Sequence, residues 1–352
     1  MAVPTETKCW VMARKPQGLP TYSGKDATFE LLTKALPELQ PNQVLVEALY
    51  LSNDPAQRTW MSLDVSAKRH YVPPIEFGSV MRARGIVKVL RSTSKGFKEG
   101  DLGYGPVGWS AYGVLDADSV RPLSPLPGGM DMTLHVGTLG LTGMTAYYGL
   151  IEIVQAKEGE TILISGAAGA TGSMAVRIAK HLVKAGKIIG IAGTDEKCRW
   201  VEKLGADLCL NYKSPTFGDD LAKATEDKLI DVFFDNVGGE MLDSMLSYMA
   251  MYGRVALCGA ISIYNSSSAT LLKNFPQLIT MRLNLRGFVV HDFSNDEAKR
   301  EQFIQAMLES DILTANDGIQ DTVVTGIVED IPKIWLRLFD GGNQGKLITK
   351  LE

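Results

Sequence analysis

The run from residue 161 to 193 constrains the fold of this 352-residue chain more than any other part of it. It reads TILIS, then the glycine turn GAAGATG, then SMAVRIAKHLVKAG, then KIIGIAG. Apolar residues of the third piece recur at helical spacing, at Ala175, Ala179, Leu182 and Val183, and polar residues fill the other face, at Arg177, Lys180, His181 and Lys184. A strand, a tight glycine turn, a helix and a second strand make one βαβ unit.

Further short apolar runs follow this unit, separated by segments of helix length. They are LCLNY (208–212), DVFFDN (231–236), RVALCG (254–259) and NLRGFVV (284–290). Repeated alternation of strand and helix predicts an α/β fold with a mostly parallel, doubly wound sheet. We therefore expect a nucleotide-binding domain over residues 133–312.

The chain before this region has a different texture. Short alternating runs broken by glycine and proline, clearest at 44–52, 85–90 and 101–105, predict an all-β domain. After residue 312 the chain reads as a strand, a short helix that ends at Gly341, and a final strand KLITKL. Because these last pieces have no partner sheet nearby in the sequence, we expect them to join the β domain, which then comprises 1–132 and 313–352.

The glycine turn predicts a dinucleotide site. Backbone can approach a pyrophosphate closely only where side chains are absent, and the N-terminus of the following helix supplies N–H groups and the positive end of a dipole. Gly169 and Gly172 match the second and third glycines of the G-x-G-x-x-G fingerprint, with Ala167 in place of the first. The flanking strands and helix favour cofactor binding over a plain turn.

The end of the second strand bears on the choice of cofactor. A carboxylate there would bind the ribose of NAD and repel a 2′-phosphate, and Asp195 and Glu196 leave that choice open. If Thr194 or Asp195 is the N-cap of the next helix, the carboxylates point toward its amides. Lys197 then pairs with a phosphate or is a solvated helix lysine.

Charge and composition exclude several classes of partner. The net charge is −4, so no basic field attracts nucleic acid or an anionic membrane, and a small-molecule partner is expected. No stretch reaches the ~18 apolar residues of a membrane-spanning helix, which predicts a soluble, cytoplasmic protein. Four well-separated cysteines argue against a disulfide framework and a cysteine-ligated metal: Cys9, Cys198, Cys209 and Cys258.

Several motifs in order resemble a known family. ISGAAGATGS, followed by IIGIAGTDEKCRWVEKLGAD, NYK, DNVGG, CGAIS and GFVV, is similar to the zinc-independent leukotriene B4 12-hydroxydehydrogenase/prostaglandin reductase branch of the medium-chain dehydrogenase/reductase superfamily, which includes alkenal double-bond reductases. The resemblance implies a Rossmann NADPH-binding domain and a GroES-like β-barrel catalytic domain. Close relatives commonly read DPYMR where this chain has Asp54-Pro55-Ala56-Gln57-Arg58, so an aromatic residue that could line the substrate site is absent there.

The resemblance also implies which residues hold NADPH. Lys197 and Tyr212 would bind the 2′-phosphate. The pyrophosphate would lie on the glycine turn, at Gly169, Ala170, Thr171, Gly172 and Ser173. Other parts of the cofactor would contact Thr145, Asn236, Cys258, Gly259, Ala260, Ile261, Ser262, Tyr264, Phe288, Val289, Val290 and Asn343.

No metal site is expected. Alcohol dehydrogenases of the same superfamily polarise an alcohol with zinc held by Cys, His and a further ligand. Here the region of the first cysteine ligand holds Asn53-Asp54-Pro55, residues 76–79 read Glu-Phe-Gly-Ser, and the four histidines are scattered.

Without a metal, the hydride acceptor has to be electrophilic by itself. A conjugated enal or enone fits, because its β-carbon accepts hydride while charge moves to the carbonyl oxygen. Tyr264 follows a core strand at its C-terminal end, where ligands of a doubly wound sheet collect. The resemblance places a tyrosine near the reacting centre, so we assign Tyr264 as the catalytic oxyanion donor and a candidate proton donor. The alternative is a loop tyrosine that only packs against the cofactor.

Two other functions remain open. The nearest is a zinc-independent NADPH quinone reductase of the same superfamily, and the second is a noncatalytic NADPH-binding sensor. The apolar run LRGFVV, as the last strand of the nucleotide domain, also predicts a homodimer formed by pairing of this edge with its copy.

Overall fold

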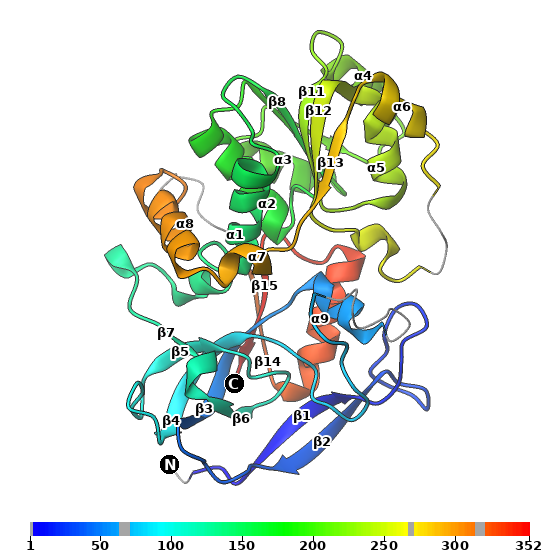
Figure 1. Cartoon of the computed structure of the whole chain (residues 1–352). Helices are drawn as coiled ribbons and strands as arrows, with labels where there is room; N and C mark the ends of the chain where they lie inside the picture. The colour runs from blue at the N-terminus through cyan, green and yellow to red at the C-terminus, as the bar shows by residue number, and fades with distance from the viewer. Residues whose placement is uncertain (1–2, 63–70, 267–270, 314–320) are drawn as a thin grey trace. The chain divides into compact units, whose positions relative to one another are not determined.

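The computed structural model describes residues 3–62, 71–266, 271–313 and 321–352 (Figure 1). The chain divides into two compact units. The β unit comprises Met1–Val136 with Thr322–Glu352, and the α/β unit comprises Gly137–Asp321. No helix within the described ranges combines the length and the apolar character that crossing a lipid bilayer requires.

The α/β unit is built on a six-stranded sheet. Its strands are β8 (Thr161–Ile164), β9 (Lys187–Ala192), β10 (Leu208–Asn211), β11 (Ile230–Asp235), β12 (Met249–Leu257) and β13 (Asn284–Gly287). They lie in the order β10-β9-β8-β11-β12-β13, and every neighbouring pair is parallel. This order, third-second-first-fourth-fifth-sixth, is the doubly wound arrangement that the alternation of strands and helices predicted.

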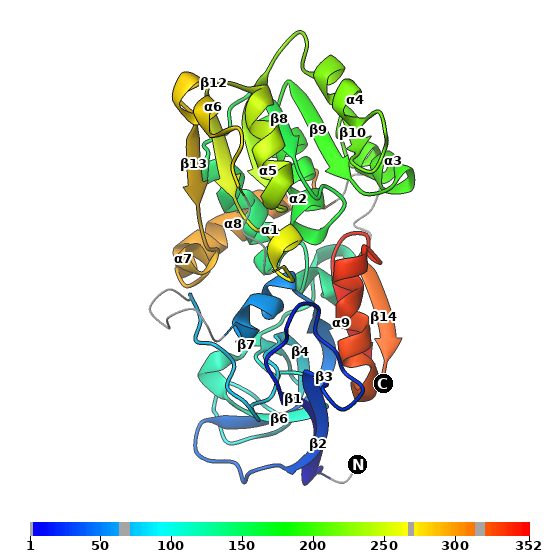
Figure 2. The ribbon, with the colours of Figure 1, turned by 90° about the vertical axis from the view of Figure 1, so that its right-hand side faces the viewer.

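Helices lie on both faces of this sheet, with α2 on one side and α5 on the other (Figures 1 and 2). The helices are α1 (Leu141–Tyr148), α2 (Ala170–Ile178), α3 (Asp195–Lys203), α4 (Phe217–Ala224), α5 (Gly239–Met245), α6 (Phe275–Thr280), α7 (His291–Ser294) and α8 (Glu297–Glu309). Shorter helical turns are η6 (Gly149–Ile153), η7 (Ala179–Val183), η8 (Leu246–Tyr248) and η9 (Ile261–Ile263). Because both faces are covered, the central strands are continuous apolar runs, and all four residues of β8 are buried.

The helix after the glycine turn differs from its expected form. It is α-helical only to Ile178, continues as the wide turn η7, and ends at Lys184, which has a φ of +57°. Arg177 was expected on a solvated face but is only 3% exposed. Its guanidinium donates to the carbonyl oxygen of Ile312, because the chain after α8 covers that side of the helix.

The β unit contains the first and last strands of the chain. They are β1 (Glu6–Met12), β2 (Phe29–Ala35), β3 (Gln43–Ser52), β4 (Gly85–Ser92), β5 (Leu102–Gly105), β6 (Tyr112–Asp116), β7 (Arg121–Pro122), β14 (Thr322–Gly326) and β15 (Leu347–Leu351). One sheet has the order β14-β15-β3-β4-β5-β7 with β6 also on β3, and β1 pairs with β2. β15 pairs antiparallel with β3, so the last strand lies in the same sheet as strands from the first part of the chain.

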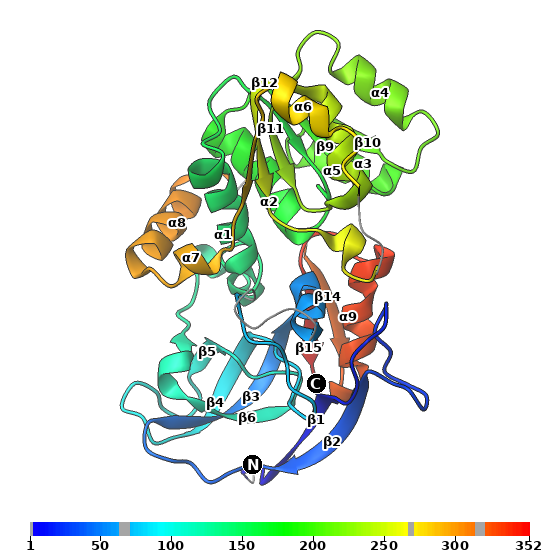
Figure 3. The same ribbon diagram turned by 45° about the vertical axis from the view of Figure 1, so that its right-hand side comes forward.

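Helix α9 (Ile331–Asp340) lies beside β14 and closes the core of the β unit (Figure 3). Its Trp335 is fully buried, and its ring meets those of Trp109 and Phe29 edge-on, with centroids 5.5 Å and 6.1 Å away. Such pairs add about 0.5–1.5 kcal/mol each to the gain from burial. The helix ends at Gly341, as expected, with a φ of +76°. Short turns in this unit are η1 (Pro55–Met61), η3 (Ala117–Ser119), η4 (Pro127–Gly129), η5 (Met132–His135) and η10 (Val328–Asp330).

Candidate functional site

Most of the predicted site residues gather at one edge of the parallel sheet. Because all six strands run the same way, their carboxyl ends share that edge. Each strand is followed there by predicted residues: β8 by Gly169–Ser173, β9 by Lys197, β10 by Tyr212, β11 by Asn236, β12 by Cys258–Ser262 and Tyr264, and β13 by Phe288–Val290. The strand order reverses between β8 and β11, which is where a doubly wound sheet binds its ligand.

The glycine turn joins β8 to α2, and its left-handed residue is Gly166, one position before Ala167. Gly166 has a φ of +57°, and its carbonyl oxygen accepts the N–H of Gly169 at 2.9 Å. Gly166 therefore takes the left-handed position that only glycine adopts readily. Ala167, which replaces the first glycine of the fingerprint, is buried, and its N–H donates to the carbonyl of Ile191 at 2.9 Å.

Gly172 allows helix α2 to lie directly on this turn. A Cβ at Gly172 would be 2.2 Å from the carbonyl oxygen of Gly166 and 2.8 Å from the Cα of Ala167. The first N–H groups of a helix have no partner within it, and α2 begins at Ala170. Bare backbone and helix amides at the end of β8 therefore fit the pyrophosphate of a dinucleotide.

The structure after β9 shows which residue is the N-cap of the next helix, α3. Thr194 is the N-cap of α3, and its Oγ1 accepts the N–H of Lys197 at 3.2 Å. The carboxylate of Asp195 accepts the side-chain N–H of Asn211 at 2.7 Å, so one of the two ambiguous acids is bound within the protein. Asp195 is thus tied to the end of β10, next to Glu196 and Lys197 in the first turn of α3.

Tyr212 lies at the end of β10, the strand next to β9. It is 47% exposed, and its ring would lie 3.2 Å from a Cβ at Gly193. The ammonium of Lys213, which sequence reasoning missed, lies 5.7 Å from the centroid of that ring. Lys197 and Lys213 therefore follow adjacent strands of the sheet, β9 and β10.

The ends of β11 and β12 are joined by hydrogen bonds. Asn236 donates from its side chain to the carbonyl of Ser165 at 2.8 Å, and the N–H of Ile261 points to the carbonyl of Asn236 at 3.4 Å. The Tyr264 hydroxyl oxygen accepts the N–H of Ala260 at 3.2 Å, so the phenol lies over the backbone that follows β12. This hydrogen bond fixes the position of the phenol oxygen relative to the loop.

Cys258 is the first residue after β12, at the start of this loop. Burial, with a smaller effect of the Asp235 carboxylate, raises the pKa of the Cys258 thiol to about 12. Since only a thiolate attacks an electrophile, this side chain stays protonated and unreactive near neutral pH.

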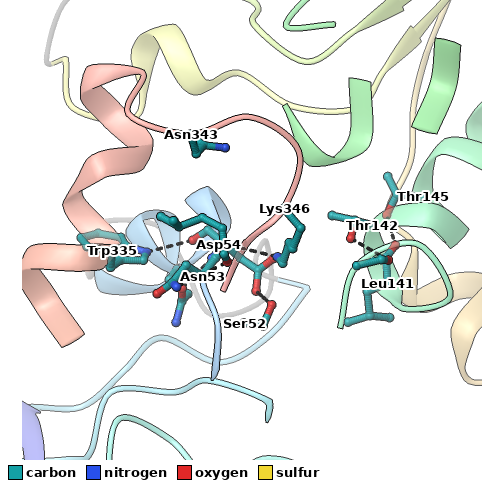
Figure 4. A network of polar contacts seen from close by, with 12 residues as sticks. Ser52, Asn53, Asp54, Leu141, Thr142, Thr145, Trp335, Asn343 and Lys346 are labelled. Carbon is teal, nitrogen blue, oxygen red and sulfur yellow. Dashed lines mark hydrogen bonds and ion pairs between the residues drawn. The ribbon is translucent and has the colours of Figure 1, made fainter. Parts of the chain in front are cut away.

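Two further sets of predicted contacts lie in α1 and directly after β13. Thr145 is in α1, and its hydroxyl donates to the carbonyl of Leu141 at 2.7 Å (Figure 4). The predicted strand over 284–290 ends at Gly287, so Phe288–Val290 follow β13 instead of belonging to it. The ring of Phe288 packs against Phe234, with centroids 6.4 Å apart.

Asn343 is the one predicted site residue that belongs to the β unit. It lies in the loop between α9 and β15, where its side chain donates to the carbonyl of Gly345 at 2.9 Å (Figure 4). Gly341 and Gly345 both have positive φ, so this loop turns sharply on either side of Asn343.

A buried ion pair near this loop was not foreseen from the sequence. The Lys346 side chain is 2% exposed, and its ammonium lies 2.5 Å from Asp54 Oδ1 and 3.0 Å from the carbonyl of Asn53 (Figure 4). Ser52 donates to the other carboxylate oxygen of Asp54 at 2.6 Å. Trp335 donates to the backbone carbonyl of Asp54 at 3.1 Å. Asp54 thus connects the end of β3, α9 and the start of β15.

Substitution of Asp54 by asparagine is expected to lower the free energy of unfolding by about 3 kcal/mol, because it leaves a buried ammonium without its carboxylate. Asp54 is 33% exposed, which places the loss at the low end of the range for buried pairs. Adding Lys346→Met should restore at least about 1 kcal/mol, since removal of the second charge relieves the first. Urea denaturation followed by tryptophan fluorescence measures both. A double variant less stable than Asp54→Asn alone would contradict this account.

Comparison with known proteins places the chain in a family. Residues 8–123 match a family model described as the N-terminal domain of oxidoreductase, and residues 170–309 match one described as zinc-binding dehydrogenase. Among the residues that the structure describes, no group of three or more His, Cys, Asp or Glu side chains is placed to hold a metal ion.

Full-length relatives give the same assignment. Prostaglandin reductase 1 of Bos taurus is 35% identical over 345 residues, covering 97% of this chain and 98% of that protein. NADPH-dependent curcumin reductase of Escherichia coli (strain K12) is 32% identical over 356 residues, covering 97% and 96%. The solved structure of CurA from Vibrio vulnificus in complex with NADPH is 30% identical, covers 98% of this chain and 99% of that one, and has a TM-score of 0.86.

The structural match to CurA over the whole chain also confirms the predicted pairing of a Rossmann domain with a GroES-like β domain. The chain belongs to the medium-chain dehydrogenase/reductase superfamily, in the branch of the prostaglandin reductases.

Proposed function

We propose that this protein is a cytoplasmic enzyme that uses NADPH to reduce the α,β carbon–carbon double bond of enals and enones. One observation carries the proposal: the glycine turn, Lys197, Tyr212 and Tyr264 follow four strands of the same parallel sheet, β8, β9, β10 and β12, at the edge where their carboxyl ends meet. Relatives named for the reduction of prostaglandins and of curcumin support this class of reaction.

The α/β unit would hold NADPH by its phosphates. The amides at the start of α2 bind the pyrophosphate, and Gly172 keeps that helix against the turn. Lys197, with Tyr212 beside it, binds the 2′-phosphate. Asn236 and the segment Cys258–Ser262 line the continuation of the same edge. When bound, NADPH supplies the hydride.

Lys197→Ala tests the phosphate contact. A charge-assisted hydrogen bond contributes about 2 kcal/mol, so the Kd of NADPH should rise about 30-fold while the Kd of NADH changes little. Fluorescence titration with each nucleotide measures both constants.

The matched control for this substitution is Lys203→Ala, which removes an exposed lysine from the last turn of the same helix. It should leave both constants unchanged. An equal loss of NADPH and NADH binding in Lys197→Ala would rule out a contact with the 2′-phosphate.

Tyr264 would act on the substrate. Its hydroxyl donates a hydrogen bond to the carbonyl oxygen of the enone as negative charge gathers there, and it is our candidate for the proton delivered to the α-carbon. The N–H of Ala260 donates to the phenol oxygen and so fixes its position. No metal enters this scheme, so activity should survive dialysis against a chelator.

The reaction class is tested by NADPH oxidation with 2-nonenal, with a simple enone and with a quinone. We expect turnover of the first two to exceed that of the quinone and to yield the saturated carbonyl compound. Turnover of the quinone alone would favour the quinone reductase, and tight NADPH binding without turnover of any acceptor would favour the sensor.

We also propose that the protein is a homodimer joined at β13. This strand is at the edge of the parallel sheet and three of its four residues are exposed, so its outer side offers a row of backbone groups to a second copy. Small-angle X-ray scattering at micromolar concentration should give the mass of two chains. A monomer under these conditions would refute the proposal.

A further inference from the structure

Asp235, at the end of β11, is a fully buried acid that the scheme above does not use. Its exposed fraction is 0%, and it lies on the strand between β8 and β12. A buried carboxylate is costly unless donors surround it, so its place at the ligand-binding edge requires an explanation.

Three donors converge on the Asp235 side chain. Ser165 Oγ donates to Oδ1 at 2.7 Å, the N–H of Val237 donates to Oδ1 at 3.0 Å, and the N–H of Gly238 donates to Oδ2 at 3.0 Å. Burial raises the pKa of Asp235, and these hydrogen bonds act against that rise. All three groups donate hydrogen bonds to the side chain, which is the pattern that suits an acceptor with two oxygens.

The donors belong to the loops that form the candidate cofactor site. Ser165 is the last residue before the glycine turn, and its Oγ also accepts the N–H of Asn236 at 2.9 Å. The backbone carbonyl of Asp235 accepts the N–H of Cys258 at 2.9 Å and of Gly259 at 3.1 Å. This one residue therefore connects the strand ends of β8, β11 and β12.

The turn that follows is closely packed on the third loop. Gly238 has a φ of +65°, and a Cβ there would lie 2.9 Å from the Cβ of Ala260. Ala260 in turn holds the hydroxyl of Tyr264. A change at the carboxylate would therefore be passed through Gly238 to the loop that carries Tyr264.

We propose that Asp235 is a positioning residue for NADPH: its carboxylate sets the relative places of the glycine turn, Asn236 and the segment Cys258–Ser262, and so determines nucleotide affinity. The proposal rests on the function proposed above. It adds that the affinity depends on a side chain that is itself too deeply buried to face the nucleotide.

Asp235→Asn tests it with almost no change of volume. The amide NH₂ would meet an N–H or O–H donor in place of an acceptor, so the loops have to separate. We expect the Kd of NADPH, measured by fluorescence titration, to rise at least about tenfold, since hydrogen bonds to charged groups carry that much free energy. At saturating NADPH, the KM of the enone should stay within about threefold of the unsubstituted protein.

The matched control is Asp243→Asn. Asp243 is 5% exposed and accepts the backbone N–H of Asn274 at 2.9 Å and its side-chain N–H at 3.0 Å, so it ties α5 to the start of α6 and not to the glycine turn. We expect Asp243→Asn to lower the melting temperature about as much as Asp235→Asn does, but to leave the Kd of NADPH unchanged within about twofold.

An Asp235→Asn variant that binds NADPH as well as the unsubstituted protein would overturn the proposal, and so would an equal loss of affinity in Asp243→Asn. If Asp235→Asn does not fold, Ser165→Ala is the test, because it removes only one of the donors to Asp235. We expect this variant to bind NADPH about threefold more weakly, and an unchanged Kd would count against the proposal. Failure of the unsubstituted protein to bind NADPH would instead remove the cofactor assignment itself.

Discussion

Replacement of Gly172 by alanine is expected to lower kcat/KM for NADPH about 100-fold. The added Cβ would lie 2.2 Å from the carbonyl oxygen of Gly166, and this neighbour is backbone that cannot rotate away. Helix α2 or the turn has to move, and a displacement of about 1 Å at a binding group costs on the order of 100-fold in rate. The same overpacking should lower stability by about 1–3 kcal/mol. Steady-state kinetics and thermal unfolding measure the two effects.

Gly218→Ala is the matched control for this substitution. Gly218 lies in α4, and a Cβ there would have no atom within 4 Å. Alanine favours the helix by up to about 1 kcal/mol, so this variant should keep its activity and be slightly more stable. A Gly172→Ala protein with normal KM for NADPH would show that the close contact of helix and turn is not needed for binding.

Tyr264→Phe is expected to lower kcat about 100-fold with the KM of NADPH changed less than about threefold. The substitution keeps the ring and removes the hydroxyl, and loss of one oxyanion donor costs about 10²–10³ in kcat. Stopped-flow measurement of NADPH oxidation in a single turnover would separate this chemical step from product release.

Tyr252→Phe removes a hydroxyl from an exposed tyrosine of β12, 67% exposed, which has no place in the proposed site. It should leave kcat unchanged. An unchanged kcat in Tyr264→Phe as well would take this residue out of the mechanism and leave it as a packing contact beside the nucleotide.

The parallel sheet could be predicted because its signals are local. Buried strands read as short apolar runs and glycine turns mark their ends, so the runs at 208–212, 231–236 and 254–259 all became strands. Boundaries were less accurate, because a strand may begin before its apolar run. β12 begins at Met249, well before the apolar run at 254–259.

Long-range partners could not be predicted in the same way. Lys346 follows a polar loop and has the pattern of a surface lysine, and its partner Asp54 lies 292 positions away. Arg177 has the spacing of a solvated helix face, and only the chain near Ile312 makes it a buried donor. Local periodicity says nothing about which distant segment will cover a face.

The contact between Asp235 and Ser165 could have been predicted from the sequence. Each is a polar residue at the end of an otherwise apolar strand, in DVFFDN and in TILIS. Asp and Ser are seldom buried without a partner, so polar residues that end two neighbouring buried strands predict a contact between them. The hydrogen bond of 2.7 Å between them is that contact.

The pairing of β15 with β3 has a consequence for how the protein is made. The α/β unit, up to Asp321, is synthesised before Thr322, whereas the β unit lacks β14 and β15 until these two strands have been made. The α/β unit can therefore fold first, while the N-terminal part of the β unit still lacks the strand that pairs with β3. Until β15 is made, the backbone groups of β3 that pair with it lack their strand partner, and an unpaired strand edge favours aggregation.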